Sequence, residues 1–438
     1  MHTKSINSGR LNALSLLIAF MPISYALGSL ILSLNTVIII IYGFYIFKFE
    51  MFIIQNKVFR YLIYFFFVYL ITITLINNLK YLNENDLYGN HVLKSFFYLR
   101  FLLLFLIVNK IAEKGFLNVR YIYLSSAFMT LFLSLDVILQ FYTTKDIFGI
   151  TSSDPNRFAG FFGNEFIAGG YLQIFSFFLI FFSILFSKNK KIFMIVFFIS
   201  VVLLLVSIAF TGNRMPFILF LICLFSFGLL EKRLRKANII ILTIVIVSIS
   251  YLINTDRSHF SNYEKVIHVR DLIKNFYANS HDILVNSKIL FSGEMKSEVN
   301  SAHLKTFYAG VDLWKENKLL GSGLKSFRIN CKFDFNKQCN THPHNYYIEL
   351  LLDVGLIGTI IMSLIFILPL WKFIKINYLI HSKNFYERLL VMPFFLIVFA
   401  YAFPIKSSGS FFTTSVSTFI FLFLGVLINS EKVKLNKL

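Results

Sequence analysis

The sequence predicts an all-α integral membrane protein, and three observations lead to this fold class. The chain has 438 residues, of which 57% are hydrophobic and 15% charged, whereas soluble proteins are about 45–50% apolar and about 25% charged. About twelve apolar runs are long enough to cross roughly 30 Å of hydrocarbon. Basic residues gather in short clusters between these runs, which is the pattern that sets membrane orientation. The formal net charge of +20 therefore indicates membrane topology and not nucleic-acid binding.

The apolar runs predict transmembrane helices joined mostly by short connections. We place them at 11–28, 29–47, 58–77, 93–110, 119–143, 164–186, 191–211, 215–230, 237–253, 346–371, 386–404 and 410–429. Lysine or arginine follows every even-numbered run, so these connections and both chain ends are expected in the cytoplasm. The first run leads directly into the second, so it is expected to be an anchor and not a cleavable signal peptide.

Two connections on the opposite side are long, 144–163 and 254–345. This predicts three parts. Spans one to nine lie in 1–253, an extracytoplasmic loop occupies 254–345, and spans ten to twelve lie in 346–438.

Arginines stand out in two of the extracytoplasmic connections. Arg157 lies in "DPNRFAGFFGNEFIAGGYL", where small residues open the next helix. Glycines let the backbone approach a ligand closely, and a helix N-terminus offers N–H groups to an anion. Arg214 lies in the short "TGNRMPF" turn, on the side where positive charge is depleted. Both are candidate anion ligands, and the alternative is that they contact lipid headgroups.

The long loop contains "SAHLKTFYAGVDLWKENKLLGSGLKSF", which predicts an amphipathic helix ending in a turn at Gly321 and Gly323. Its apolar residues recur at the spacing of one helical face: Leu304, Phe307, Tyr308, Val311 and Trp314. This face is expected to rest on the membrane surface or the bundle. The loop also contains Cys331 and Cys339 on a side where disulfides form, so a bridge and two free thiols both stay open.

The segment "THPHNYYIELLLDVGLIG" places polar residues at the start of the tenth span. Pro343 restricts His342 to extended backbone, and Asn345 is a good helix N-cap, so His344 is presented at the mouth of the span. The polar residues of the helix recur every four positions on one face: Asn345, Glu349 and Asp353. The carboxylates are expected to face the bundle interior or a wet cavity. We therefore expect a functional role for His344.

These segments, in this order, resemble the O-antigen ligase and polymerase superfamily of bacterial envelope glycosyltransferases. The resemblance runs from Asp154 to Gly358 and is closest in "RFAGFFGNEFIAGGYL", "LWKENKLLGSGLKSF" and "HPHNYYIELLLDVGLIG". It implies a GT-C-like bundle of the bacterial inner membrane, with a large helical loop between spans nine and ten and an active site facing the periplasm. It also implies a glycan donor carried by undecaprenyl pyrophosphate, and neither metal nor cofactor.

Residue roles follow from the same resemblance. It implies that His344 is the catalytic histidine and that Arg214 is an essential arginine contacting pyrophosphate, with Arg157 assisting. A second family arginine is missing, because His303 stands in its place ahead of "KEN". Other candidates for its charge are Lys305, Arg257 and Arg270. The remaining substrate-binding candidates are His342, Asn345 and Glu349.

The chemistry of these residues agrees with the resemblance. Departing pyrophosphate needs its charge stabilised, and arginines hold phosphate oxygens bidentately. His342 and His344 are the only paired imidazoles and would need further ligands to bind zinc, so no metal site is expected. A histidine has a pKa suited to a general base, and Glu349 is expected to orient it or to replace it. A single attack at the anomeric carbon predicts inversion.

The function expected is transfer of a saccharide from the lipid carrier to a hydroxyl of lipid A–core, as in an O-antigen ligase. A polymerase that joins lipid-linked repeats is the alternative, and the sequence does not separate the two. A transporter or flippase is the rival from another class, favoured by Arg100 in span four. Transporters typically show repeat symmetry and polar breaks near mid-bilayer, whereas the polar residues here lie at one face.

Overall fold

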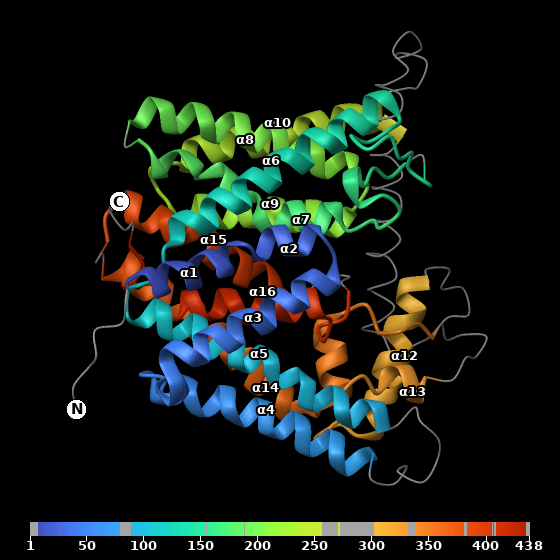
Figure 1. Cartoon of the computed structure of the whole chain (residues 1–438). Coiled ribbons are helices and arrows are strands. Elements are labelled where there is room, and N and C mark those ends of the chain that lie inside the picture. Colours follow the sequence, from blue (N-terminus) through green and yellow to red (C-terminus); the bar gives the residue numbers. More distant parts are fainter. Residues whose placement is uncertain are drawn as a thin grey trace. The chain divides into compact units, whose positions relative to one another are not determined.

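The computed structural model describes residues 8–78, 89–154, 156–187, 189–255, 270–271, 302–331, 339–380, 383–404, 406 and 409–434 (Figure 1). These residues are helical and include no β-strand, although an isolated bridge pairs Lys145 with Thr151. The all-α prediction is therefore confirmed for this part of the chain. Contacts divide the chain into two compact units. Unit 1 comprises Met1–Ser125 and Val299–Leu438, and unit 2 comprises Ser126–Glu298.

Unit 1 is built mainly from apolar helices of different lengths, together with the amphipathic α12 and the short α13. They are α1 (Ser8–Ala19), α2 (Met21–Ala26), α3 (Ser29–Phe47), α4 (Lys57–Asn78), α5 (Gly89–Glu113), α12 (Ala302–Glu316), α13 (Phe327–Asn330), α14 (Tyr346–Ile374), α15 (Phe385–Ala402) and α16 (Thr414–Leu427). Helix α14 packs on α4 and α12, while α16 packs on α5 and α15. Helices α12 and α13 lie where α14 begins (Figure 1). We call this region the α12 end of unit 1; it includes the end of α4, the start of α5 and residues 318–331.

Unit 2 contains most of α6 (Val119–Thr143), which starts in unit 1, followed by α7 (Ala168–Ile180), α8 (Lys190–Phe210), α9 (Arg214–Leu230) and α10 (Arg235–Asn254). Helices α7, α8 and α9 pack against one another, and α10 packs on α9. Asn189 begins α8 by accepting a hydrogen bond from the N–H of Lys191, which satisfies one of the donors that a helix start leaves unpaired.

Most of the predicted spans coincide with one helix, but the runs 11–28 and 164–186 each divide into two, the second into α7 and the 3-10 helix η4 (Phe182–Leu185). The run 119–143 matches α6 residue for residue. The run 11–28, expected as one span, divides into two consecutive helices: α1 ends at Ala19, and α2 follows with Pro22 in its first turn. Proline lacks the N–H that a continuing helix needs and clashes with the preceding turn. Gly28 then takes a φ of 108° before α3.

Membrane crossing follows from helix length and hydropathy. Seven of the described helices are long and apolar enough to span a bilayer, and α7, α9 and α16 are shorter apolar helices. The number of twelve spans, the loop layout and the division at 253 and 345 stay predictions.

The amphipathic helix of the long loop is confirmed as α12, and the face that packs on α14 is not the face of large apolar residues. Thr306 and Ala309 are buried, whereas the side chains of Phe307, Tyr308 and Trp314 are only partly covered. Ala309 packs with Phe327 and Leu352. Small residues face α14 because the helices approach closely: a Cβ on Gly310 would lie 2.7 Å from Ile348 Cγ2.

Helix α14 is broken at Gly355, whose φ of 64° is left-handed. The break exposes backbone groups of 352–357 to the segment 318–323. Four N–H···O bonds of 2.8–3.3 Å join the two segments, from Ser322 to Leu352, Gly323 to Asp353, Leu356 to Lys318 and Ile357 to Leu319. The "LLGSGL" turn is therefore docked onto the break in α14.

We expect Gly355→Ala to destabilise unit 1. Its Cβ would collide with the backbone carbonyl of Leu319, and a non-glycine residue at this φ adds about 1–3 kcal/mol of strain. The unfolding midpoint in detergent should fall by several degrees. Gly409→Ala is the control, because nothing lies within 4 Å of its Cβ. Matching midpoints for the two variants would contradict the docking described above.

Candidate functional site

The two histidines of the "HPH" element form one cluster in front of α14. His344 has a left-handed φ of 56°, which residues with a Cβ rarely adopt. Its imidazole is half-buried, with Nε2 3.3 Å from Asn340 Nδ2 and its ring centroid 4.3 Å from that of His342. Nδ1 of His342 lies 2.9 Å from Thr341 Oγ1. The turn therefore fixes the imidazole of His344 directly at the helix start.

Both the oxygen and the nitrogen of the Asn345 side-chain amide form hydrogen bonds that hold this turn. The Oδ1 atom accepts hydrogen bonds from the N–H groups of Tyr347 and Ile348, so Asn345 is the N-cap that the sequence predicts. The Nδ2 atom donates to the carbonyls of Pro404 (3.0 Å) and Lys406 (3.1 Å). The whole amide is thus engaged in holding the histidine turn against the segment after α15.

Glu349 is buried and caps the loop before α16. Its Oε1 accepts from Ser410 Oγ (2.5 Å) and its Oε2 from the N–H of Phe411 (2.6 Å). The sequence suggested an imidazole as its partner; the described contacts instead direct both oxygens to this loop. Glu349 therefore stabilises the packing of α16 on α14.

Asp353 is fully buried one turn further along α14. Its Oδ2 accepts from the N–H of Lys325 (2.6 Å), and its Oδ1 accepts from the N–H (3.0 Å) and Oγ (2.7 Å) of Ser326. Lys325 has a left-handed φ of 58°. The carboxylate thus holds the "GLKSF" turn in a conformation that it would not adopt alone.

Helices α4 and α5 hold the same turn from the opposite side. The N–H of Leu324 donates to Thr74 Oγ1 (2.9 Å), and the carbonyl of Leu324 lies 3.1 Å from His91 Nδ1. Asn77 Nδ2 donates to the carbonyl of Gly321 (3.2 Å). Three helices of unit 1 therefore position the turn that carries Lys325.

In unit 2, Arg157 and Arg214 are brought close together. Nη2 of Arg157 donates to Asn213 Oδ1 (2.8 Å), and the guanidinium lies 4.1 Å from the ring centroid of Phe166. Nδ2 of Asn213 donates to the carbonyl of Phe166 (3.0 Å). Arg214 is the first residue of α9, and its charge interacts with that of Arg157. Asn213 thus orients Arg157 beside Arg214, and we call these two residues the arginine pair.

Glycines allow the backbone segments of this region to meet. A Cβ on Gly212, whose φ is 66°, would lie 2.6 Å from the carbonyl of Asn156. A Cβ on Gly169 would lie 2.5 Å from Thr211 Oγ1. No side chain caps α7 or α9 by a hydrogen bond, and the first N–H groups of a helix are favourable anion donors.

The arginine pair has no acidic partner within ion-pair distance among the described residues. Burial lowers the pKa of Arg157, an effect that the nearby Asp154 partly opposes, and a guanidinium still stays charged at neutral pH. The Nε of Arg157 is buried without a hydrogen-bond acceptor. Two adjacent cations and an unsatisfied donor make the pair suited to a polyvalent anion.

The structure does not identify which residue supplies the charge of the missing family arginine. The side chain of His303, on α12, and the whole of Arg257 lie outside the described residues. Lys305 is half-buried on α12. Arg270 is engaged, with Nη1 3.0 Å from Oδ1 of Asp271. The residue that supplies this charge stays open.

Arg100, which favoured transport in the sequence, links two helices of unit 1. Its Nη2 donates to Oγ1 of Thr414 (3.0 Å) at the start of α16, and its guanidinium lies 4.7 Å from the ring centroid of Phe101. These contacts give Arg100 a packing role between α5 and α16.

Cys331 and Cys339 are joined by a disulfide, and Cys223 is a buried free thiol. The bridge follows α13 and closes a short loop just before the histidine turn.

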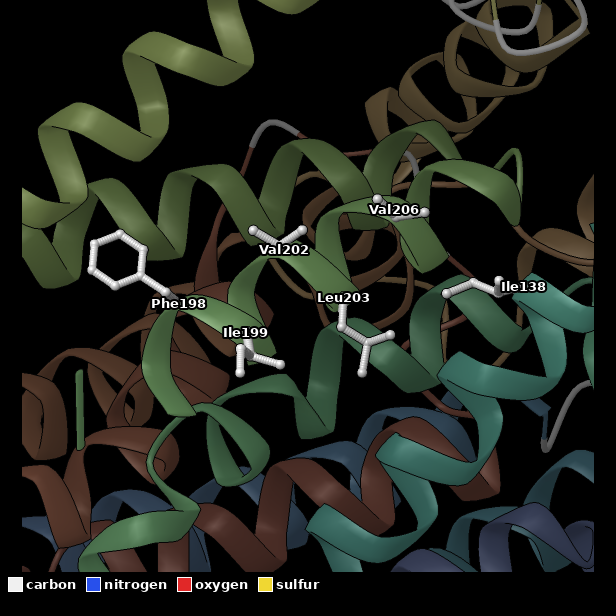
Figure 2. A pocket seen from close by; sticks show the side chains of 6 residues that line it. All are labelled: Ile138, Phe198, Ile199, Val202, Leu203 and Val206. Atoms are coloured by element: carbon white, nitrogen blue, oxygen red, sulfur yellow. The ribbon is translucent and has the colours of Figure 1, made fainter. Parts of the chain in front are cut away.

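One hollow of unit 2 is apolar throughout. It has a volume of about 480 Å³, and Figure 2 shows its lining side chains on α6 and α8: Ile138, Phe198, Ile199, Val202, Leu203 and Val206. Such a surface suits lipid chains and offers no group for chemistry. Among the described residues, no three histidine, cysteine, aspartate or glutamate side chains cluster closely enough to hold a metal ion.

We expect Asp353→Ala to be strongly destabilising. It removes the acceptor of two N–H groups and one hydroxyl, and each buried unsatisfied donor costs about 1–3 kcal/mol. Asp312→Ala is the matched control, because Asp312 pairs with the exposed Lys315 on the surface of α12, where ion pairs contribute little. Thermal unfolding in detergent distinguishes the two, and a similar loss in both would show that Asp353 does not hold the turn.

Sequence reasoning singled out both arginines and His344 but missed two positioning residues. Asn213 stands beside Arg214, and a polar residue next to an arginine in a tight turn was the available signal. Ser410 lies in a serine-rich stretch after α15, which gives no indication of its partner Glu349.

A comparison with curated proteins finds no match. Residues 199–363 match the family model Wzy_C, described as O-antigen ligase. The matched stretch contains Arg214, the "KEN" element, the docked "GLKSF" turn and the histidine turn. Residues 199–363 are therefore similar to the O-antigen ligase family, within a chain whose apolar helices indicate a multi-pass membrane protein.

Proposed function

We propose that the protein is a membrane glycosyltransferase that moves a saccharide from an undecaprenyl-pyrophosphate carrier to the sugar hydroxyl of lipid A–core, at the periplasmic face. The observation that carries this proposal is the arginine pair. Arg157 is oriented by Asn213 beside Arg214, with no acidic partner within ion-pair distance in the described part of unit 2. Such a pair has the charge and the donors that a diphosphate requires.

The arginine pair acts on the leaving group. When the anomeric carbon–oxygen bond breaks, negative charge develops on the departing diphosphate. Guanidinium groups held in place before the reaction stabilise that charge without reorganisation. The N-termini of α7 and α9 add backbone N–H groups, which carry partial positive charge and therefore also attract the diphosphate. Positive charge for the reaction is thus supplied by the protein itself.

His344 acts on the acceptor. A neutral imidazole takes the proton from the attacking hydroxyl, which then displaces the diphosphate in a single step with inversion. The left-handed backbone of His344 is the kind of local strain that clusters at active sites. Asn345 holds the histidine turn against the segment after α15, at the start of α14.

The acceptor separates the ligase from the alternative, a polymerase that joins lipid-linked repeats. Loss of a ligase leaves long lipid-linked chains unattached to core, whereas loss of a polymerase leaves core capped by a single repeat. The glycan profile of a deletion strain therefore decides which acceptor is used.

We expect His344→Ala and Arg214→Ala to lose glycan transfer by at least about 10²-fold, because each removes a group that acts on the reacting atoms. Purified protein given lipid-linked glycan and acceptor provides the assay. Arg235→Ala is the control, since Arg235 binds the carbonyls of Gly228 and Leu229 at the opposite end of α9. Full activity in either test variant, at normal expression, would remove the mechanism.

The mechanism also requires the arginine pair and the histidine turn to meet in the working enzyme. Cysteines placed at the exposed positions Asn156 and Thr341 should be joined by a short bifunctional thiol reagent in membranes. Lys191, at the start of α8, replaces Asn156 in the control pair and should not be joined to Thr341. If only the control pair is cross-linked, the arginine pair and the histidine turn lie on different sides of the membrane, and the mechanism is contradicted.

A further inference from the structure

Three cationic side chains gather at the α12 end of unit 1. Lys325 lies in the docked turn, Arg328 in α13 and Lys94 in the first turns of α5. Nδ1 of His91, three residues before Lys94, lies 3.1 Å from the carbonyl of Leu324, the residue before Lys325, and the charges of Arg328 and Lys94 both act on Lys325. The start of α5 and α13 lie at the same end of the unit (Figure 1). Residues distant in sequence thus form one basic cluster, Lys94, Lys325 and Arg328.

The backbone under Lys325 is fixed from both sides. Asp353 accepts the N–H of Lys325, while Thr74 and His91 hold the N–H and carbonyl of Leu324. The left-handed φ of Lys325 carries a steric cost that these contacts offset. The amino group is therefore carried by a rigid support and not by a flexible loop.

Among the described residues, four lysines of unit 1 are paired with a carboxylate, whereas the three members of the basic cluster are not. Lys110, Lys114, Lys315 and Lys372 each lie within 3.3 Å of a carboxylate oxygen. In the part of the chain that the structure describes, no ion pair or side-chain hydrogen bond engages any member of the cluster.

The neighbouring carboxylates do not form ion pairs with the basic cluster. Glu349 and Asp353 attract Lys325 through their charge, but their oxygens are occupied by the hydrogen bonds to Ser410, Phe411, Lys325 N–H and Ser326. Burial, with the charges of Arg328 and Lys94, lowers the pKa of Lys325. Like charges repel one another, and the oxygens of the two nearby carboxylates are already engaged, so an anion brought among the three cations would be bound favourably.

We infer that Lys325, with Arg328 and Lys94, forms a phosphate-binding subsite of unit 1, separate from the arginine pair of unit 2. The ligand class is a phosphoryl group carried by a substrate, and its link to glycan transfer rests on the proposed function. Two substrates supply this chemistry: the diphosphate of the lipid carrier and a phosphorylated sugar of the acceptor. Lysine binds phosphate as a point charge and arginine as a fork.

The first experiment measures binding of inorganic pyrophosphate to the full-length protein in detergent by calorimetry. The background carries Arg157→Ala and Arg214→Ala, so that the arginine pair does not contribute. Lys325→Gln should weaken the remaining binding by about tenfold, as expected for one charge-assisted contact. Lys325→Arg should retain binding, and Lys315→Gln is the control because Lys315 is paired with Asp312. Arg328→Gln, at an exposed position, repeats the test if Lys325→Gln folds poorly.

The second experiment identifies the source of the phosphate by transfer kinetics in the otherwise unaltered protein. A rise of about tenfold in the KM for a phosphorylated acceptor, absent with the dephosphorylated acceptor, assigns the subsite to the acceptor. A rise in the KM for the lipid-linked donor assigns it to the carrier diphosphate. If Lys325→Gln and Arg328→Gln both match Lys315→Gln in pyrophosphate binding, the subsite does not exist. Because the binding test needs no turnover, it stands even if the proposed transfer activity fails.

Discussion

The buried carboxylate of Asp353 determines the conformation of the α12 end. Removing a carboxylate from water costs several kcal/mol unless hydrogen bonds replace the lost solvent, and here the replacing donors are those of Lys325 and Ser326. The break at Gly355, two residues later, opens α14 so that the 318–323 segment can pair with it. The carboxylate and the break act together, since each places the turn where the other can hold it.

The same use of carboxylates recurs in both units. Glu349 accepts the N–H of Phe411 before α16. In unit 2, Asp136 accepts the N–H of Ile147, and Asp146 accepts those of Phe148 and Ile150. A carboxylate that caps a loop has its oxygens directed at N–H donors and not at a cation. The arginine pair and the basic cluster consequently keep their charge available, although several acids lie in the same regions of sequence.

Hydropathy and charge alternation predict most of the helices because apolar length and flanking lysines are properties of single segments. These patterns fail where a single residue interrupts a helix. Pro22 divides the first predicted span, and the average hydropathy of 11–28 does not reflect this interruption. The spacing of large residues identified the apolar face of α12, but it did not indicate that the opposite face of small residues packs on α14, where Gly310 allows a close approach. Helical spacing correctly placed Glu349 on the inner face, but spacing alone does not identify Ser410 as its partner.

In the candidate site too, features set by a few consecutive residues could be predicted, whereas contacts between distant segments could not. A turn, an arginine or an N-cap such as Asn345 is visible in a few consecutive letters, so these were predicted. The orientation of Arg157 by Asn213, and the gathering of Lys94 around Lys325, depend on segments far apart in the chain. Such clusters hold like charges together before any ligand is bound, and the fold provides the free energy that this requires. For the proposed transfer reaction, clusters organised in this way need little rearrangement when an anionic ligand arrives, which is the condition under which fixed charges lower a reaction barrier most.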